Sequence, residues 1–332
     1  MLKYKLPMKF TLFLMVVVTA GASAVTLIGG GATEPAALKI AYAVGVPGRG
    51  DGQFNEPTDV AFDPAGKLYV VDRRNVRVQR FKPDGFFDGI IGRFGWEGEG
   101  LVAPYGIALD HDVYIYVSDG RRNLIHQYDY FGRYLKSYGQ TDAIASHFDG
   151  PAGLAVDNMG NVWVADGGNH KVKRLNAIGE ITMEIGYYGA DLGKLNLPTG
   201  VALDAEGGVA VADGGNSRVQ FFDRFGNALA SVANLPEKNL STPAAVAYDK
   251  FGNVFIADTG NDRIVVLDAG RRYLFAYGKF GQDLKGFNHP SGLTFAPDGR
   301  LYVADTFNNV VKVLEVTYRT PEKKAAPPPH EP

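Results

Sequence analysis

Side chains able to carry chemistry are sparse in this chain of 332 residues. It has no cysteine, which excludes thiol nucleophiles, disulfides, haem attachment through cysteine and a lipoprotein anchor. No GxSxG nucleophile motif, phosphate-binding glycine loop or HExxH zinc motif occurs. The remaining candidates for a metal site are the six histidines, which are His111, His126, His147, His170, His289 and His330.

These residues are set in a repeated framework. The stretch Pro151 to Asp166, PAGLAVDNMGNVWVAD, has recognisable copies throughout the chain, and their starts are 47, 47, 47, 45 and 47 residues apart. A fixed period of this length indicates a solenoid, propeller or array. The six copies begin at Pro57, Pro104, Pro151, Pro198, Pro243 and Pro290.

A complete period contains four short β-rich runs. In the third copy these are Gly153 to Val156, Val162 to Ala165, His170 to Leu175 and Glu180 to Ile185, separated by turn-forming residues. Four antiparallel strands in one period form one blade of a β-propeller, and a blade can bury its faces only against neighbouring blades. The sequence therefore predicts an all-β, six-bladed propeller.

The last copy lacks a fourth strand before its tail. Leu38 to Gly45, LKIAYAVG, matches the fourth-strand segments Tyr273 to Gly278 and Arg133 to Gly139. We therefore expect an N-terminal strand to complete the last blade, which closes the ring and leaves no open sheet edge. The propeller should span residues 38–318, after a linker at 25–37 and before a proline-rich, disordered tail at 319–332.

Residues 1–24 have the features of an export signal. Lysines precede an apolar run, and Ala22-Ser23-Ala24 fits a cleavage site. The alternative is an uncleaved membrane anchor over residues 10–28. Both place the propeller outside the cytoplasm, in the periplasm or extracellular space. With 34 basic and 36 acidic side chains, the chain has no basic field for nucleic acid, and RNA binding is disfavoured.

Three sets of residues recur at fixed places in the copies. A large apolar residue lies three positions before each proline, and we expect it to pack between blades. An aspartate closes each copy, and we expect its carboxylate to cap the following turn. Asparagines such as Asn169 suit a left-handed turn position. The cations Arg77, Lys171, Arg218 and Arg263 should be structural, with packed stems and ion pairs. The closing aspartates are Asp72, Asp119, Asp166, Asp213, Asp258 and Asp305.

This pattern resembles the NHL-repeat family, with Asn169-His170-Lys171 the nearest match to the tripeptide that names it. The resemblance spans about Leu38 to Tyr318 and implies the fold, but not one function, because the family includes RNA binders, protein scaffolds, sensor domains and some enzymes. In the peptide-amidating lyases, which are similar to this family, histidines directly after such prolines hold zinc. No histidine occupies those positions here, so that activity is not implied.

A metal site from other histidines is also unfavourable. His147, His170 and His289 fall in loops expected on one face, but His289 belongs to blade six, opposite blade three. We expect no metal and no cofactor. The residues near the channel that could support an enzyme, a lyase or hydrolase, are Asp59, Tyr105 and Thr199.

The clearest departure from the repeat follows the closing aspartates of blades one and two, where arginines replace the small residues of blades three, four and five. With Trp96 in the loop from Arg93 to Ala103 and Tyr105 at the channel, these arginines are typical of a recognition surface. The alternative is solvated arginines paired with Glu97 and Glu99. We predict a non-catalytic, extracytoplasmic binding or assembly scaffold for a protein or anionic polymer, of undetermined oligomeric state. Its partner-binding residues would be Arg73, Arg74, Trp96, Tyr105, Arg121 and Arg122.

Overall fold

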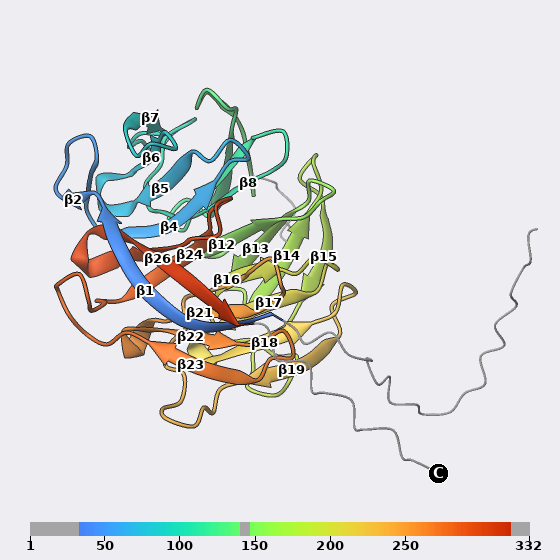
Figure 1. Ribbon diagram of the computed structural model, residues 1–332. Coiled ribbons are helices and arrows are strands. Elements are labelled where there is room, and N and C mark those ends of the chain that lie inside the picture. Colours follow the sequence, from blue (N-terminus) through green and yellow to red (C-terminus); the bar gives the residue numbers. More distant parts are fainter. Residues whose placement is uncertain (1–32, 140–146, 320–332) are drawn as a thin grey trace, which may run out of the picture. The chain divides into compact units, whose positions relative to one another are not determined.

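The computed structural model describes residues 33–139 and 147–319, and the regular structure there consists of strands and short 3-10 turns. Six four-stranded antiparallel sheets form the blades of a propeller, as the sequence predicts (Figure 1). No helix within these two ranges is long and apolar enough to cross a membrane. The expected export signal and the tail beyond Arg319 lie outside the described residues.

Blades one to three follow one another along the chain. Blade one comprises β4 (Pro57–Phe62), β5 (Leu68–Asp72), β6 (Arg77–Phe81) and β7 (Phe87–Ile91). Blade two comprises β8 (Pro104–Leu109), β9 (Ile115–Asp119), β10 (Leu124–Tyr128) and β11 (Tyr134–Tyr138). Blade three comprises β12 (Pro151–Val156), β13 (Val162–Asp166), β14 (Lys171–Leu175) and β15 (Ile181–Ile185).

Blades four to six complete the ring. Blade four comprises β16 (Pro198–Leu203), β17 (Val209–Asp213), β18 (Arg218–Phe222) and β19 (Ala228–Val232). Blade five comprises β20 (Ala245–Tyr248), β21 (Val254–Asp258), β22 (Arg263–Leu267) and β23 (Tyr273–Tyr277). Blade six comprises β24 (Pro290–Phe295), β25 (Leu301–Asp305), β26 (Val310–Arg319) and β1 (Glu34–Val44).

The short turns between strands two and three define one face of the propeller, together with the loops between blades. Strands β2 (Val46–Pro47) and β3 (Gln53–Phe54) form a small parallel pair in the loop that enters blade one. Because the strands of a blade alternate in direction, the first and third hairpin turns lie on the opposite face. The 3-10 turns are η1 (Arg73–Asn75), η3 (Gly214–Asn216), η4 (Thr259–Asn261) and η5 (Thr306–Asn308).

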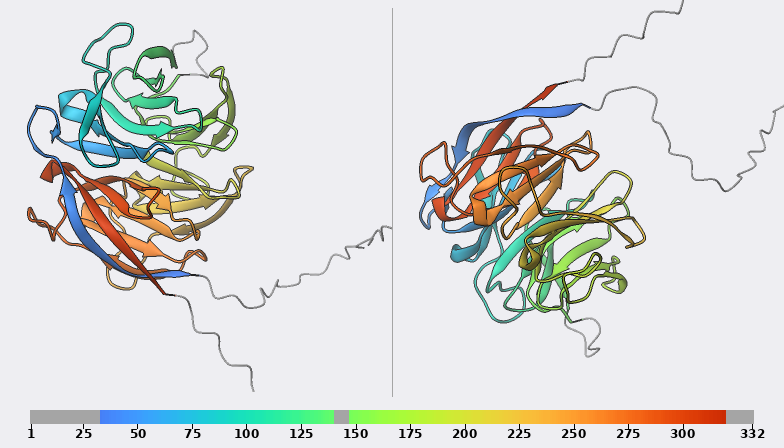
Figure 2. Two further views of the ribbon diagram at one scale, coloured as in Figure 1. Left: turned by 45° about the horizontal axis from the view of Figure 1, so that its top comes forward. Right: turned by 90° about the horizontal axis from the view of Figure 1, so that it is seen from below.

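The N-terminal strand closes the ring as predicted. Strand β1 pairs antiparallel with β26, and the two strands run side by side at the edge of blade six (Figure 2). β1 begins at Glu34, earlier than the expected Leu38, and its pairing with β26 starts there, with Glu34 opposite Arg319. Asn253 Nδ2 donates to the Thr33 carbonyl at 3.0 Å, and the rings of Phe251 and Tyr318 lie 5.1 Å apart. The terminal strands therefore join blade six to blade five.

Each blade interface has its own apolar core. Six buried clusters combine residues from two neighbouring blades, including the pair formed by blades six and one. The recurring apolar residue before each proline is buried in these interfaces, which confirms its expected role. Burial of such a side chain stabilises the fold by about 1.5–3 kcal/mol. These residues are Phe54, Leu101, Phe148, Leu195, Leu240 and Phe287.

The predicted turn cap is present in blade two, where Asp119 accepts N–H groups of its own turn, but the closing aspartates of blades one, four, five and six have a different role. All six are fully buried, and at η1, η3, η4 and η5 the aspartate makes no side-chain cap. One oxygen instead accepts the backbone N–H that follows the interface residue, as in Asp149 N to Asp166 Oδ1 at 2.7 Å. The carboxylate therefore fixes the incoming loop, and an asparagine such as Asn169 donates its Nδ2 to the other oxygen.

A buried cation completes most of these junctions. Arg77, Arg218 and Arg263 donate Nε to their aspartates at 2.7–2.8 Å, as expected for structural cations. Lys171 also forms an ion pair, but its partner is Glu184 on the next strand and not the closing aspartate of its blade. Blades three and six use Lys173 and Lys312 instead, two residues further along the strand, with Nζ 2.7 and 2.8 Å from the carboxylates.

The left-handed position in the turn is also one residue later than predicted. The asparagines do not adopt it in blades one and three to six, whereas the next residue does, with φ of 52–56°. These residues are Val76, His170, Ser217, Asp262 and Asn309, and blade two has Asn123 there. The asparagine is thus selected for its bond to the aspartate.

Blade two replaces the buried cation with a neutral side chain. His126 Nε2 lies 4.0 Å from Asp119 Oδ2, and burial lowers the pKa of His126 from 6.5 to about 4. Asp119 accepts backbone N–H groups instead, from Val102 and Ala103 in the entering loop and from Arg121 and Arg122 in its own turn. Among the six junctions in the described ranges, this is therefore the one whose stability should fall in mild acid because of a buried histidine.

Replacing His126 with lysine should remove that sensitivity. As the pH falls from 6.5 to 4, the unfolded chain protonates His126 while the folded chain keeps it neutral, so the fold loses stability, on the order of 3 kcal/mol. His126→Lys should give Asp119 a permanent cation, so the free energy of unfolding should change less between pH 6.5 and 4. Urea unfolding at several pH values measures the effect, with the exposed His111→Lys as control. An unchanged acid-induced loss in His126→Lys would contradict this assignment.

Candidate functional site at the channel mouth

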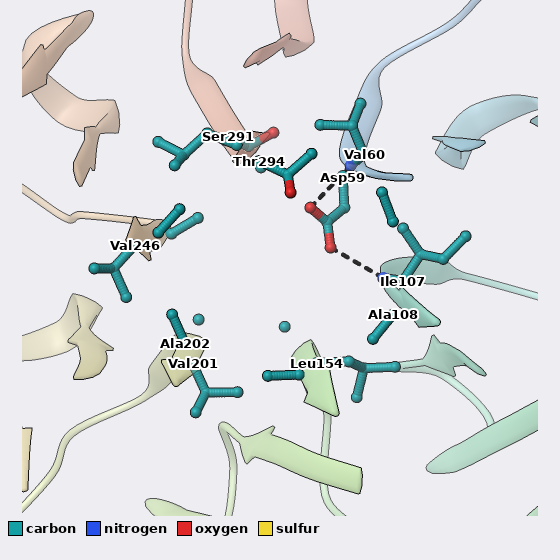
Figure 3. A pocket seen from close by; sticks show the side chains of 18 of the residues that line it. Asp59, Val60, Ile107, Ala108, Leu154, Val201, Ala202, Val246, Ser291 and Thr294 are labelled. Atoms are coloured by element: carbon teal, nitrogen blue, oxygen red, sulfur yellow. Dashed lines mark hydrogen bonds between the residues drawn. The ribbon is translucent and has the colours of Figure 1, made fainter. Parts of the chain in front are cut away.

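The first strands of the six blades surround a central channel with a volume of about 360 Å³ (Figure 3). Its wall is formed mainly by valine, leucine, isoleucine, alanine and glycine. Among the lining residues, Asp59 is the one acidic or basic side chain. The channel can therefore accept a largely apolar group and offers it a single carboxyl.

Asp59 points into the channel from β4. Its two oxygens accept the N–H groups of Val60 and Ile107, both at 2.9 Å (Figure 3). Burial raises the pKa of Asp59 to about 7, although both backbone bonds oppose the rise. A carboxyl with this pKa can gain or lose a proton near neutral pH, as a general acid or base must.

Most blades have no room for a side chain at the position of Asp59 on the first strand. The equivalent residues are Gly106, Gly153, Gly200, Ala245 and Gly292. A Cβ on any of these four glycines would lie 3.0 Å or less from atoms of the next strand, so the inner strands meet backbone to backbone. Asp59 is accommodated beside Gly292, where a Cβ would be 2.2 Å from Asp59 Oδ1. The carboxyl is therefore a specific departure from the repeat.

Tyr105 and Arg73 continue this departure toward the mouth of the channel. The Arg73 guanidinium lies over the Tyr105 ring, 5.8 Å from its centroid, as in a cation–π contact. Tyr105 lines the channel, and burial raises the pKa of its hydroxyl. The Arg73 side chain remains 41% exposed, with Glu56 4.0 Å away. The structure thus brings two predicted partner-binding residues together at the channel.

The other predicted residues have different surroundings. Arg74 is 63% exposed and pairs with Glu56 at 2.8 Å. Arg121 is exposed. Arg122 donates to the carbonyls of Gly98 and Gly100, so it holds the loop that carries Trp96. The carboxylate near Arg73 and Arg74 is thus Glu56, in place of Glu97 and Glu99.

Trp96 is 60% exposed on this loop. It belongs to the face formed by the turns between strands two and three and by the loops between blades. Arg122 can therefore act on a partner through the position of the loop, whereas Arg73, Arg121 and Trp96 are available for direct contact. Glu56 was missed by sequence reasoning, although it is the acidic residue at a position where the other copies have Ala103, Gly150, Leu197, Thr242 and His289.

The junction between blades one and two also lacks a bond found at the others. At five junctions, the left-handed residue of one blade accepts the N–H of the residue before the next blade's proline, as in Glu56 N to Asn309 Oδ1 at 2.7 Å. Val76 occupies the acceptor position in blade one and has no side-chain acceptor. A β-branched residue at φ 54° is strained, and such strain is frequent at functional sites.

The remaining candidates for an enzyme have structural bonds. Thr199 lines the channel, but its hydroxyl donates to the Pro243 carbonyl of the next blade at 2.9 Å. Thr58 and Ser291 make the same kind of bond to the next blade, to the carbonyls of Tyr105 and Thr58. Within the described ranges, no group of three histidine, aspartate or glutamate side chains could hold a metal ion.

Six four-stranded blades around a central channel define a six-bladed β-propeller. The family model for the SMP-30/Gluconolactonase/LRE-like region matches residues 15–187, more than half of the chain. The chain belongs to this family. NHL repeats also match, at residues 195–222 and 287–314, which confirms that resemblance.

Solved structures of similar fold have several functions. A streptogramin B lyase has a TM-score of 0.61 and 13% identity over 84% of this chain and 98% of that one. A gluconolactonase from Xanthomonas campestris has a TM-score of 0.63 and 16% identity over 88% and 99%. A chain of a nidogen/laminin complex has a TM-score of 0.56 and 19% identity over 75% and 84%. At these identities the likeness shows the fold alone.

The raised pKa of Asp59 predicts a second pH effect, opposite in sign to that of His126. Between pH 4 and 7 the folded chain keeps a proton that the unfolded chain has released, so Asp59 lowers stability as the pH rises. Asp59→Asn should remove this fall. Urea unfolding in a His126→Lys background would isolate the effect, and equal pH slopes with and without the Asp59→Asn change would contradict the shifted pKa.

Proposed function

We propose that this protein is an extracytoplasmic binding module, and that the face around the channel mouth receives an anionic group of its partner. The observation that supports this most is the placement of Arg73 over Tyr105 at the channel, with Arg121 and Trp96 exposed on the same face. Arginine forks and exposed indoles are enriched where proteins recognise partners. The partner class is a protein with an acidic segment or an anionic polymer.

The location follows from the N-terminal sequence. Residues 1–24 combine lysines, an apolar run and Ala22-Ser23-Ala24, which favours export with cleavage. Retention of residues 10–28 would instead anchor the propeller at the membrane surface. Either form presents the binding face outside the cytoplasm, where protein partners and anionic polymers of the envelope are available.

The second candidate function is an acid–base enzyme of the channel, a lyase or hydrolase. Asp59 supports it, because a channel carboxyl with a pKa of about 7 suits proton transfer. The family also includes gluconolactonases by its description, and lyases share the fold. The substrate would enter past Tyr105 and Arg73, so both candidates use the same mouth. They differ in whether Asp59 is required.

Changing Arg73 and Arg121 to serine should reduce capture of an anionic partner at least tenfold. Each charge-assisted hydrogen bond contributes about 1.5–3 kcal/mol, and tenfold in affinity corresponds to about 1.4 kcal/mol. Binding to immobilised poly-L-glutamate and pull-down from the native envelope measure the effect. Arg133→Ser with Arg272→Ser is the matched control, because these side chains are 75% and 77% exposed at turns of the opposite face.

Equal binding by both double variants would contradict the proposed face. Asp59→Asn separates the two functions on the same samples. It should leave capture unchanged if the protein is a binding module, whereas loss of turnover of a bound small molecule in this variant would favour the enzyme.

A further inference from the structure

A second cavity lies on the opposite face, between blades three and four. Its volume is about 680 Å³, within the range of about 300–1,000 Å³ usual for small-molecule sites. The first hairpin turns of both blades border it, together with β14, β15 and the turn before β19. The cavity shares Val156 and Leu203 with the channel lining, but its turns lie on the face opposite the channel-mouth loops proposed above as the binding site.

Unusual residues of the chain converge on this cavity. The sequence has five methionines, and the two within the described ranges, Met159 and Met183, both line it. Trp163, one of two tryptophans, also contributes to the wall. Met159 is 86% exposed and Phe225 is 68% exposed, so the apolar surface is open to solvent. Flexible, polarisable methionines adapt to apolar ligands of varied shape.

Two arginines border the apolar surface. The guanidinium of Arg174 lies 5.5 Å from the Trp163 ring centroid, and that of Arg224 lies 4.9 Å from the Phe225 ring centroid. Arg174 Nε donates to Thr182 Oγ1 at 2.9 Å. Across residues 33–139 and 147–319, neither arginine forms an ion pair, whereas Arg133, Arg272 and Arg300 on the same face each pair with an aspartate.

The acidic residues of the cavity are mostly engaged in their own turns. Asp157 accepts bonds from Met159, Asn161 and Trp163. Asp204 Oδ1 accepts the N–H groups of Glu206 and Gly208. Glu206 is exposed at the tip of its turn and would repel an anion from that side. The cavity therefore offers an apolar floor bordered by one arginine from each of the two blades and by the three acidic side chains.

We propose that this cavity binds a small amphipathic carboxylate, with its apolar part against Met159, Met183 and Phe225 and its carboxylate at Arg174 and Arg224. Arginine's planar fork matches a carboxylate in two parallel hydrogen bonds. The apolar contacts supply most of the affinity, and the arginines set the preference for an acid over its neutral analogue.

Intrinsic fluorescence tests this site, because Trp96→Phe leaves Trp163 as the single tryptophan. In this background, titration with decanoate and with 3-phenylpropionate should give a saturable change in emission. The corresponding amides should bind at least tenfold more weakly. Absence of saturable binding by either acid, or equal affinity for an acid and its amide, would overturn the proposal.

Substitutions that change charge around the cavity should alter the affinity for the acids in opposite directions. Arg224→Gln should weaken binding of the acids at least tenfold, and Glu206→Gln should strengthen it about two- to threefold because a repulsive charge is removed. Arg133→Gln, on the same face but outside the cavity, should have no effect. Met159→Glu, at an exposed position that tolerates the change, should weaken the acids more than the amides. Equal effects of Arg224→Gln and Arg133→Gln would also overturn the proposal.

Discussion

The buried aspartate at the end of each second strand is the constraint on which the ring depends. Its carboxylate accepts the N–H of the loop entering the blade and, in five blades, also the amide of a turn asparagine and a buried arginine or lysine. A charge removed from water must be paired and hydrogen-bonded to be tolerated. Because the loop comes from the previous blade, satisfying this carboxylate also places the apolar interface residue and sets the junction between blades.

The repeat made the architecture predictable. The six aligned copies predicted four strands per blade, an apolar residue between blades and closure by an N-terminal strand. The structure confirms these three predictions. Side-chain partners were less predictable, because the cation of a junction can come from either of two positions on the third strand. Lys171 and Lys173 both follow Asp166, and only the direction of each side chain decides that Lys173 is buried. The left-handed residue was likewise misplaced by one.

The residues of the channel mouth could be predicted in part, because the sequences of blades one and two differ from the other copies there. Arg73, Tyr105 and Asp59 could each be named, but their stacking and the raised pKa of Asp59 depend on distances between blades. Glu56 and the strained Val76 gave weaker signals, each a single unusual residue at a repeated position. The cavity between blades three and four gave none, since its residues come from turns and strands that the repeat treats as ordinary.

The central claim is that the buried carboxylates hold the ring together, and unfolding of Asp166→Ala tests it most directly. This change leaves Lys173 buried without its partner, which should cost about 3–5 kcal/mol in free energy of unfolding by urea. Asp223→Ala is the comparison, since Asp223 also accepts several turn N–H groups but lies outside the junctions, and it should cost about 1 kcal/mol. Equal losses for the two variants, or an Asp166→Ala protein as stable as the original, would contradict the account.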